Sequence, residues 1–227
     1  MGLRGQKPKG KVKIKWSPNF SYAIGLLVTD GCLSSDGRHI LFVSKDEEQV
    51  KNYMKALGIK VRVGSTVSGH NGKKAFRVQF SDVLFYGFLL SIGLTPAKSL
   101  TMRNIYIPDK YFFHFLRGCF DGDGYSYSYW DKRWKSSFMF YIGFVSGSKA
   151  YVDWFRSTLW RLSGLTGHIT KAKRKNICYQ LKYAKQEATT LSKLMYATKN
   201  GTRLTRKYLK IKKTLDIVGN QLKEERI

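Results

Sequence analysis

The chain has 227 residues, of which 43% are hydrophobic, and its 41 lysines and arginines against 15 acidic residues give a formal net charge of +26. This hydrophobic content is enough for a packed core and excludes a disordered basic chain, while the charge indicates a polyanionic partner, nucleic acid before a membrane surface. Three widely spaced cysteines argue against a disulfide framework and a zinc site. No apolar run is long enough to span a bilayer, so we expect an intracellular protein. Whether its origin is organellar, bacterial, archaeal or from a phage stays open.

Both ends of the chain are basic. Residues 1–19 form an arm that contains no acidic residue and that Gly and Pro interrupt, and residues 198–227 form a second basic segment in which we expect a helix. Such an arm suits contacts with phosphates as well as it suits a solubilising tail, and the sequence does not distinguish the two roles.

Residues 20–93 are expected to form a unit with the order helix, two strands, helix, two strands, helix. Its elements are a helix at 20–29, a hairpin at 32–44 that turns at Asp36-Gly37, a helix at 45–57, strands at 59–68 and 75–80, and a helix at 81–92 capped by Ser81 or Asp82.

After a connector at 94–108, residues 109–197 repeat this order. The repeat has helices at 110–122, 148–163 and 186–197 and strands at 125–130, 138–146, 168–173 and 177–183. The run Phe-Val-Ser precedes the second helix of both units, at 42–44 and at 144–146, which supports a true duplication.

Each unit opens on a similar stretch, Ala23–Gly31 in the first and Leu116–Gly124 in the second. Both are apolar, have helical length and end in Asp-Gly. The third and seventh positions are small and lie on one helical face, so two such helices can approach closely. The small residues are Gly25, Thr29, Gly118 and Gly122. If the two stretches pack on each other, Asp30 and Asp123 emerge side by side.

Paired carboxylates at helix C-termini are unfavourable, because each faces the negative end of a helix dipole and the two repel each other. A divalent cation would remove the penalty, and oxygen ligands beside a phosphate substrate suit Mg²⁺. The alternative is two buried helices followed by ordinary Asp-Gly turns.

Both stretches resemble the motif of the LAGLIDADG homing endonucleases, in the form with two motifs on one chain. The second copy is close to the motif pattern, whereas the first has Val28 where the second has Asp121. The resemblance implies an α+β fold of two pseudo-symmetric αββαββα units, with the motif helices at the seam and the antiparallel sheets forming a DNA-binding saddle. It also implies that the acids of the eighth motif position, Asp30 and Asp123, bind metal.

The implied function is that of a site-specific double-strand DNA endonuclease that acts as a monomer, without an obligate protein partner, on a long asymmetric target. Asp30 and Asp123 would hold two or more Mg²⁺ ions with the backbone carbonyls of Thr29 and Gly122, and Mn²⁺ or Ca²⁺ could replace Mg²⁺ for binding. The resemblance also implies that basic residues line the catalytic pocket. Lys98 matches such a position in the first unit, and Lys207 or Arg206 matches it in the second. The alternative role of these residues is phosphate binding without catalysis.

Each sheet must cover its helices with one face, so the other face is free to enter a major groove. The residues expected on the free face of the first sheet, or beside it, are Ser34, Asp36, Arg38, Arg62, Thr66, Arg77 and Gln79. Those of the second sheet are Tyr127, Tyr129, Lys171, Lys173, Gln180 and Lys182. For Tyr125 and Tyr127 a place in the core is the alternative, and for any single basic residue phosphate contact is the alternative to base reading.

Two other classes of protein remain open from the sequence. One is a non-cleaving binder, such as an RNA splicing maturase or a DNA-binding regulator, and the other is a ribosome-associated or chromatin-like basic protein. The second class rarely carries 15% aromatic residues.

Overall fold

The structure, a computed structural model, describes residues 10–67, 72, 74–173, 177–198, 201–219 and 222, apart from the side chain of Lys173. The first nine residues of the predicted arm therefore lie outside the described part. The first unit consists of α1 (Pro18–Asp30), β1 (Gly31–Leu33), β2 (His39–Ser44), α2 (Glu47–Leu57), β3 (Gly64–Val67), β4 (Lys74–Ser81) and α3 (Val83–Ser91). The second consists of the 3-10 turn η1 (Asp109–Tyr111), α5 (Phe112–Asp121), β5 (Tyr125–Trp130), β6 (Phe138–Ser146), α6 (Lys149–Ser163), β7 (His168–Lys173), β8 (Ile177–Ala184) and α7 (Lys185–Met195).

The predicted α+β fold with two αββαββα units is confirmed. Each unit carries one four-stranded antiparallel sheet, with the order β1-β2-β4-β3 in the first and β5-β6-β8-β7 in the second. The registers also correspond, because Arg77 lies opposite Val43 and Gln180 lies opposite Val145. The two sheets are thus copies of one arrangement, in which Arg77 and Gln180 occupy equivalent places.

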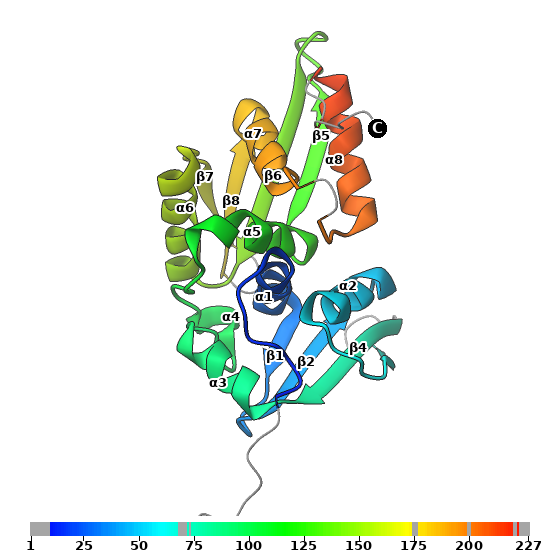
Figure 1. Cartoon of the computed structure of the whole chain (residues 1–227). Coiled ribbons are helices and arrows are strands. Elements are labelled where there is room, and N and C mark those ends of the chain that lie inside the picture. Colours follow the sequence, from blue (N-terminus) through cyan, green and yellow to red (C-terminus); the bar gives the residue numbers. More distant parts are fainter. Residues whose placement is uncertain are drawn as a thin grey trace, which may run out of the picture.

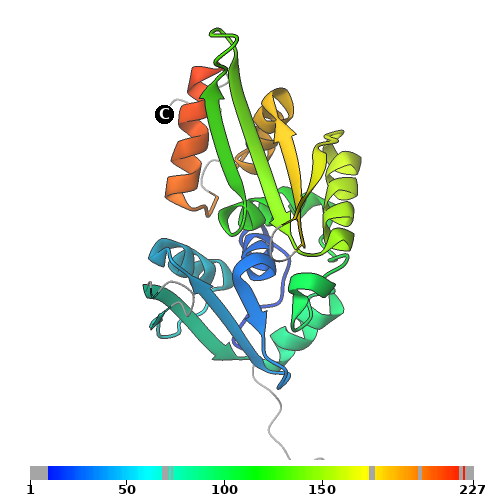
Figure 2. The ribbon, with the colours of Figure 1, turned by 180° about the vertical axis from the view of Figure 1, so that it is seen from behind.

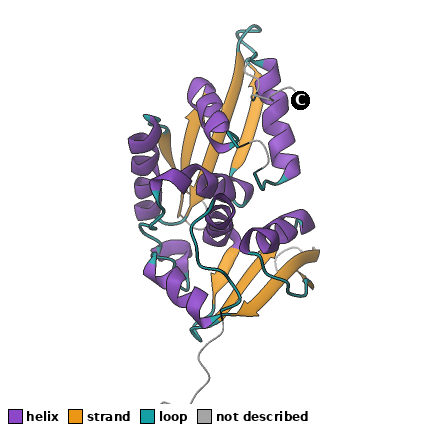
Figure 3. Ribbon diagram, viewed as in Figure 1, coloured by secondary structure: helices purple, strands orange, loops and turns teal. Residues whose placement is uncertain are grey.

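The helices cover one face of each sheet (Figure 1). Seen from behind, both sheets turn their other face to the viewer with no helix in front (Figure 2). Figure 3 shows α1 and α5 crossing at the centre, between the two sheets. The antiparallel sheets therefore have one dry face on the helices and one free face, as their alternating burial requires.

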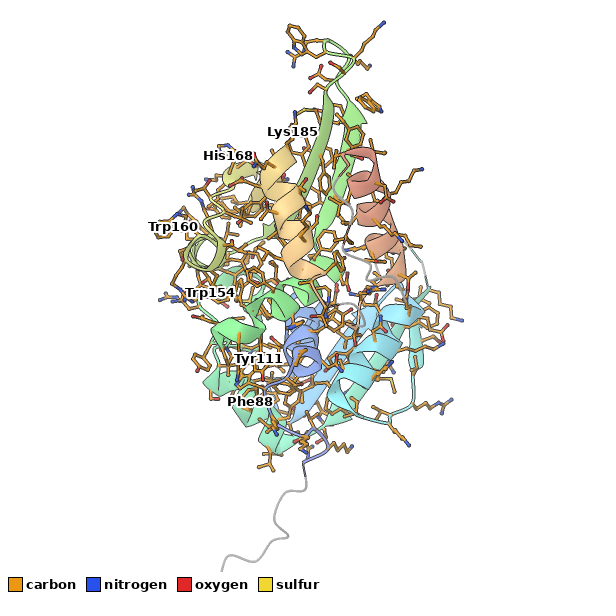
Figure 4. The ribbon with its side chains drawn as sticks, turned by 45° about the horizontal axis from the view of Figure 1, so that its top comes forward. Phe88, Tyr111, Trp154, Trp160, His168 and Lys185 are labelled. Atoms are coloured by element: carbon orange, nitrogen blue, oxygen red, sulfur yellow. The ribbon has the colours of Figure 1, made fainter. Side chains whose placement is uncertain are left out.

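Aromatic residues fill much of the core behind the sheets. In the second unit Phe112 and Phe115 of α5 lie with ring centroids 6.3 and 6.2 Å from Trp154 of α6, which Figure 4 labels. Trp16, which precedes α1, packs edge-on against Phe88 of α3 at 5.7 Å. Such edge-to-face pairs add to the burial of apolar area and fix the helices on each sheet.

Local signals set the helix boundaries. Ser17 caps α1 by accepting a hydrogen bond from Phe20 N, and Pro18 occupies the first turn. Of the two residues expected to cap α3, it is Asp82 that accepts from Phe85 N, at 2.9 Å. Asp82 also accepts from the backbone N–H groups of Lys11 and Val12 and so holds the chain that leads into α1.

Three expectations need correction. The strand expected at 59–68 is formed only at 64–67, because Gly58 ends α2 in a left-handed conformation and Ile59 N donates to Met54 O. This contact ties the next residues to the helix end instead of to β4. The connector holds a short helix, α4 (Lys98–Thr101), that the sequence did not indicate. Pro108-Asp109 starts a 3-10 turn, and α5 begins only at Phe112.

The basic C-terminal segment contains the expected helix, α8 (Thr205–Ile217), which lies beside β5 (Figure 1). Among the described residues, no helix is long and apolar enough to cross a membrane.

Candidate active site

The small-residue face of the two motif helices lies at the seam, as the spacing predicts. A Cβ atom on Gly25 would stand 2.2 Å from Phe115 O, and one on Gly118 would stand 2.1 Å from Tyr22 O. Real Cβ atoms do not approach a carbonyl oxygen so closely, so α1 and α5 are in backbone contact that only glycine permits. This contact brings the C-terminal ends of both helices to one place.

The two motif acids meet at these ends. Helix α1 ends at Asp30 itself, whereas α5 ends at Asp121, so Asp123 lies in the turn that follows. A Cβ atom on Gly122 would stand 2.8 Å from Asp30 Oδ2, which shows how tightly the second turn covers the first acid. Asp30 is partly buried and Asp123 is exposed.

The electrostatics of the pair favour a cation. Burial and, next, the Asp123 carboxylate raise the pKa of Asp30 from 3.8 to about 7. The protein that surrounds Asp123 raises the pKa of that carboxyl as well, and Lys207 and Lys98 oppose the shift. Two carboxylates that are costly to ionise together, beside open solvent, fit Mg²⁺, which usually takes one or two protein carboxylates and completes its shell with water and phosphate oxygens. Among the described residues, no three His, Cys, Asp or Glu side chains gather as a metal cluster.

Gln49 is a site residue that the sequence analysis missed. Its amide Nε2 donates to Asp30 Oδ2 at 3.2 Å and to Asp121 O at 3.1 Å, and its Oε1 accepts from Ser44 Oγ at 2.7 Å. The repeated Phe-Val-Ser run held the signal, because five residues after Ser44 comes Gln49 and five residues after Ser146 comes Tyr151. The equivalent position of the second unit thus carries an aromatic ring.

Lys98 and Lys207 reach equivalent backbone atoms. The ammonium group of Lys98 donates to Gly31 O, directly after Asp30, and that of Lys207 donates to Gly124 O, directly after Asp123, at 2.7 Å. Lys207 also donates to Phe120 O at 2.6 Å and to Gly122 O at 2.7 Å. Burial lowers the pKa of Lys98 and lowers that of Lys207 to about 8. Both ammonium groups therefore lie at the acids, and both are partly desolvated.

Arg206, the alternative to Lys207, is engaged elsewhere. Its guanidinium forms a salt bridge of 2.7 Å with Asp46, which directly precedes α2 of the first unit. The side chain therefore joins α8 to the opposite unit, and Lys207 is the residue that reaches the motif ends.

Each acid faces its own hollow. Asp30 lines a hollow of about 380 Å³ together with Ser44, Gln49 and Thr66. Asp123 lines one of about 120 Å³ together with Ser146, Tyr151 and Lys98. The predicted DNA contact Thr66 thus lines the same hollow as the first acid.

Asp121, at the sixth motif position, serves the fold. Its side chain is fully buried, and its Oδ2 accepts from Tyr22 OH and from Leu204 N, both at 2.7 Å. Leu204 immediately precedes α8, which carries Lys207. The first unit has the buried Val28 at this position, so only the second motif helix has a polar attachment there.

The free face of the first sheet gathers three of the predicted DNA contacts. Arg62, Arg77 and Gln79 line a hollow with Gly64. Ser34, Asp36 and Arg38 lie on the turn between β1 and β2 at the end of the sheet. There the Asp36 carboxylate is engaged by the ring of His39 and by the backbone N–H groups of Arg38 and His39.

The free face of the second sheet carries the predicted tyrosines, and Lys171 departs from the prediction. Tyr125, Tyr127 and Tyr129 stand on it, and Tyr127 is 37% exposed, so the alternative of a core position is wrong for Tyr127. Lys171 pairs with Tyr179, and Gln180 pairs with Thr170. Because neighbouring strand residues alternate, the exposed Lys171 lies on the opposite face from Gln180 and Lys182. Lys173 pairs with Ile177, and its side chain is outside the described part.

No protein-family model and no curated protein sequence matches the chain. Its fold, however, matches LAGLIDADG homing endonucleases over most of its length. The structure of I-GzeII in complex with a DNA target is 10% identical, with a TM-score of 0.60 over 90% of this chain and 90% of that one. I-DmoI in complex with DNA and Ca is 14% identical, with a TM-score of 0.51 over 80% of this chain and 91% of that one.

The same fold occurs in full-length WhiA from Thermatoga maritima, at 14% identity and a TM-score of 0.53. That match covers 94% of this chain but 64% of WhiA, so the chain spans less than two thirds of that relative. At these identities the likenesses establish the fold alone.

Proposed function

We propose that the protein is a site-specific double-strand DNA endonuclease that requires a divalent metal. The observation that carries the proposal is the meeting of Asp30 and Asp123 at the two motif-helix ends, where the surrounding protein raises the pKa of both carboxyls and the Asp123 carboxylate raises that of Asp30 further. A protein that only bound nucleic acid would gain nothing from this unfavourable pair.

The metal ligands in this proposal are the Asp30 and Asp123 carboxylates, with the backbone carbonyls of Thr29 and Gly122. The Gly122 carbonyl already accepts a hydrogen bond from Lys207, so it would share its second lone pair with the ion. Two or more Mg²⁺ ions held here would supply an activated water and stabilise the leaving oxygen of each strand. Mn²⁺ or Ca²⁺ would replace Mg²⁺ for binding.

The other side chains of the site would orient the carboxylates and stabilise negative charge on the phosphate. Gln49 fixes the orientation of the Asp30 carboxylate through its amide. The ammonium groups of Lys98 and Lys207 stabilise negative charge that develops on the phosphate, because they are already held at the motif ends and partly desolvated.

The proposed substrate is double-stranded DNA with a long asymmetric target, one half lying on each sheet. Arg77 and Gln79 would contact base edges, since Arg and Gln form bidentate hydrogen bonds with guanine and adenine. A single chain supplies both halves of the site and would act as a monomer. The basic segments 1–19 and 198–227 would flank units 20–93 and 109–197, which the connector 94–108 joins.

A cleavage selection tests this proposal. The protein is incubated with Mg²⁺ and a randomised double-stranded library, beside Asp30→Asn and Asp123→Asn. One enriched site, cut on both strands by the wild type and spared by either variant, is the expected result. If the wild type selects a DNA or RNA sequence but cuts nothing, the protein is a non-cleaving binder and the catalytic assignment is wrong.

A further inference from the structure

Four tyrosines form one group on the free face of the second sheet, the side seen in Figure 2. This tyrosine wall consists of Tyr125, Tyr127 and Tyr129 of β5 and Tyr141 of β6. Ring centroids lie 6.3 Å apart between Tyr125 and Tyr127 and 6.4 Å apart between Tyr127 and Tyr129. Tyr141, which pairs with Tyr127 in the register, lies 4.7 Å from that ring.

The rings of the wall turn their faces to one another and their rims outward. The planes of Tyr127 and Tyr129 differ by 1°, and those of Tyr127 and Tyr141 by 14°. The hydroxyl of Tyr125 donates a hydrogen bond to Gln180 Oε1 at 3.3 Å. The side chain of Tyr141 is hydrogen-bonded to that of Tyr129. A ligand therefore meets a row of ring edges together with the Tyr127 hydroxyl, and Tyr127 and Tyr129 are 37% and 46% exposed.

The first sheet has no such wall at the equivalent positions. Its pair Cys32–Leu41 corresponds to the pair Tyr125–Gly143. A Cβ atom on Gly143 would stand 2.3 Å from the ring of Tyr125, so glycine at this position makes room for the ring. The first sheet instead offers Arg62, Arg77 and Gln79. The two sheets therefore present different chemistry to a groove.

The ring edges of the wall discriminate among base pairs in the major groove. Guanine, cytosine and adenine present only hydrogen-bonding groups, which lose water against ring edges without gaining a partner there, whereas thymine presents a methyl group beside its O4 acceptor. Stacking of unpaired bases is disfavoured, because the ring faces are turned toward neighbouring rings. Lys182 and Gln180 share this face and supply polar contacts beside the wall.

We propose that the tyrosine wall makes the second unit select thymine-rich sequence through contacts with thymine methyl groups. This inference rests on the proposed function, because it requires that the free faces of the sheets bind duplex DNA. The target would then have a half chosen by Arg and Gln hydrogen bonds and a half chosen by apolar contact.

The test is a binding selection with the full chain in Ca²⁺, followed by replacement of thymine by uracil in the selected duplex. We expect A·T pairs to be enriched in one half of the site, and uracil there to weaken binding about fourfold for each buried methyl. Tyr127→Ala and Tyr129→Ala should lose this uracil penalty, whereas Tyr127→Phe, which keeps the ring, should retain it. Both positions are exposed, so the variants should fold, which thermal unfolding checks.

Gln79→Ala on the first sheet is the matched control, and it should change the base preference of the other half while leaving the uracil penalty intact. A selected site without thymine enrichment, or a uracil penalty that survives both alanine variants, overturns the inference and leaves the proposed function standing. Preference for single-stranded oligothymidine over every duplex also overturns it, because the rings would then stack on bases. If no duplex is selected at all, the proposed function fails and this inference fails with it.

Discussion

The two halves of the candidate site share the same backbone arrangement and differ in the side chains that surround it. Both have a motif acid, a hollow and a lysine that donates to the carbonyl after the acid. The first hollow holds Gln49 and measures about 380 Å³, whereas the second holds Tyr151 and measures about 120 Å³. The two units thus share the backbone arrangement around the acids, whereas the side chains beside each acid differ between the units.

The lysines show the same contrast. Lys98 stands on a helix of one turn in the connector, and Lys207 stands on α8 and donates to three carbonyl groups around the second motif turn. Asp121 anchors the start of α8, and Val28 offers no polar counterpart. The second half is therefore held by more hydrogen bonds, and the two halves need not contribute equally to cleavage.

The largest effect is expected from disrupting the contact between α1 and α5, on which both halves of the site depend. Gly25→Ala should cost at least about 3 kcal/mol or prevent folding, because the new methyl group would meet Phe115 O at 2.2 Å with no side chain that can move away. Gly87→Ala in α3 is the matched control, since a Cβ atom there meets nothing within 4 Å and helix propensity favours alanine. Thermal unfolding compares the two, and equal stability of both variants would contradict the close contact of α1 and α5.

The lysines sharpen the contrast between the halves. Lys207→Met should slow cleavage about a hundredfold or more, as loss of a donor to developing charge does elsewhere, and Lys98→Met should slow it less because Lys98 holds a single carbonyl. Rates on each strand of an end-labelled target measure both effects, and one strand should be affected more by each variant. Equal losses on both strands in both variants would show that the halves act as one.

Asp121 separates a structural from a catalytic role in the second motif. Asp121→Val, which copies the first unit, should cost about 3 kcal/mol, because Tyr22 OH and Leu204 N would be left buried without their acceptor. Asp121→Asn keeps an acceptor oxygen and should cost much less. Chemical denaturation gives both values, and a harmless Asp121→Val would mean that α8 is held by its other contacts.

The smallest expected effect concerns the salt bridge that links α8 to the first unit. Arg206→Ala removes the bridge to Asp46 but leaves Lys207 in place, and at a partly exposed pair we expect a loss of under about 1 kcal/mol that shrinks at high salt. Lys149→Ala, which breaks a pair with Asp153 inside α6, is the control. A large loss for Arg206→Ala alone would show that this bridge joins the two units cooperatively.

The repeated fold and the packing of the motif helices could be predicted because they depend on local sequence patterns. The spacing of Gly25 and Gly118, the Asp-Gly ends and the repeated strand order are periodic features, and the structure confirms the fold that they indicate. The shortened strand β3 escaped prediction because its alternating valines compete with a helix cap at Gly58 that ties the next residue down.

The surroundings of the acids were harder to predict because they come from distant segments. Gln49 is a buried polar residue of α2, and although the Phe-Val-Ser repeat marks its position in the unit, its contact with Asp30 depends on how α2 packs on α1. Asp121 has no local signal for its contact with Leu204, which is 83 residues away. Lys171 was assigned to the wrong face because the register of β7 against β8 cannot be read from an alternating pattern alone.

Asp30 and Asp123 form a pair whose ionisation is costly and which a divalent cation should relieve, and thermal unfolding of the protein as a function of pH measures this cost. Because folding raises the pKa of Asp30 from 3.8 to about 7, the folded chain takes up a proton between these values, so the metal-free protein loses stability as the pH rises from 4 to 7. Asp30→Asn should therefore be more stable than the wild type at pH 8, by about 2 kcal/mol after allowance for partial exposure, or roughly 5 °C.

That gain should shrink to a small remainder at pH 4, where the wild-type carboxyl is protonated in the folded state and about half protonated in the unfolded state. At pH 8, Mg²⁺ should stabilise the wild type and leave Asp30→Asn unchanged. A wild type that is already as stable as Asp30→Asn at pH 8 without metal, and that Mg²⁺ does not stabilise, would contradict the account.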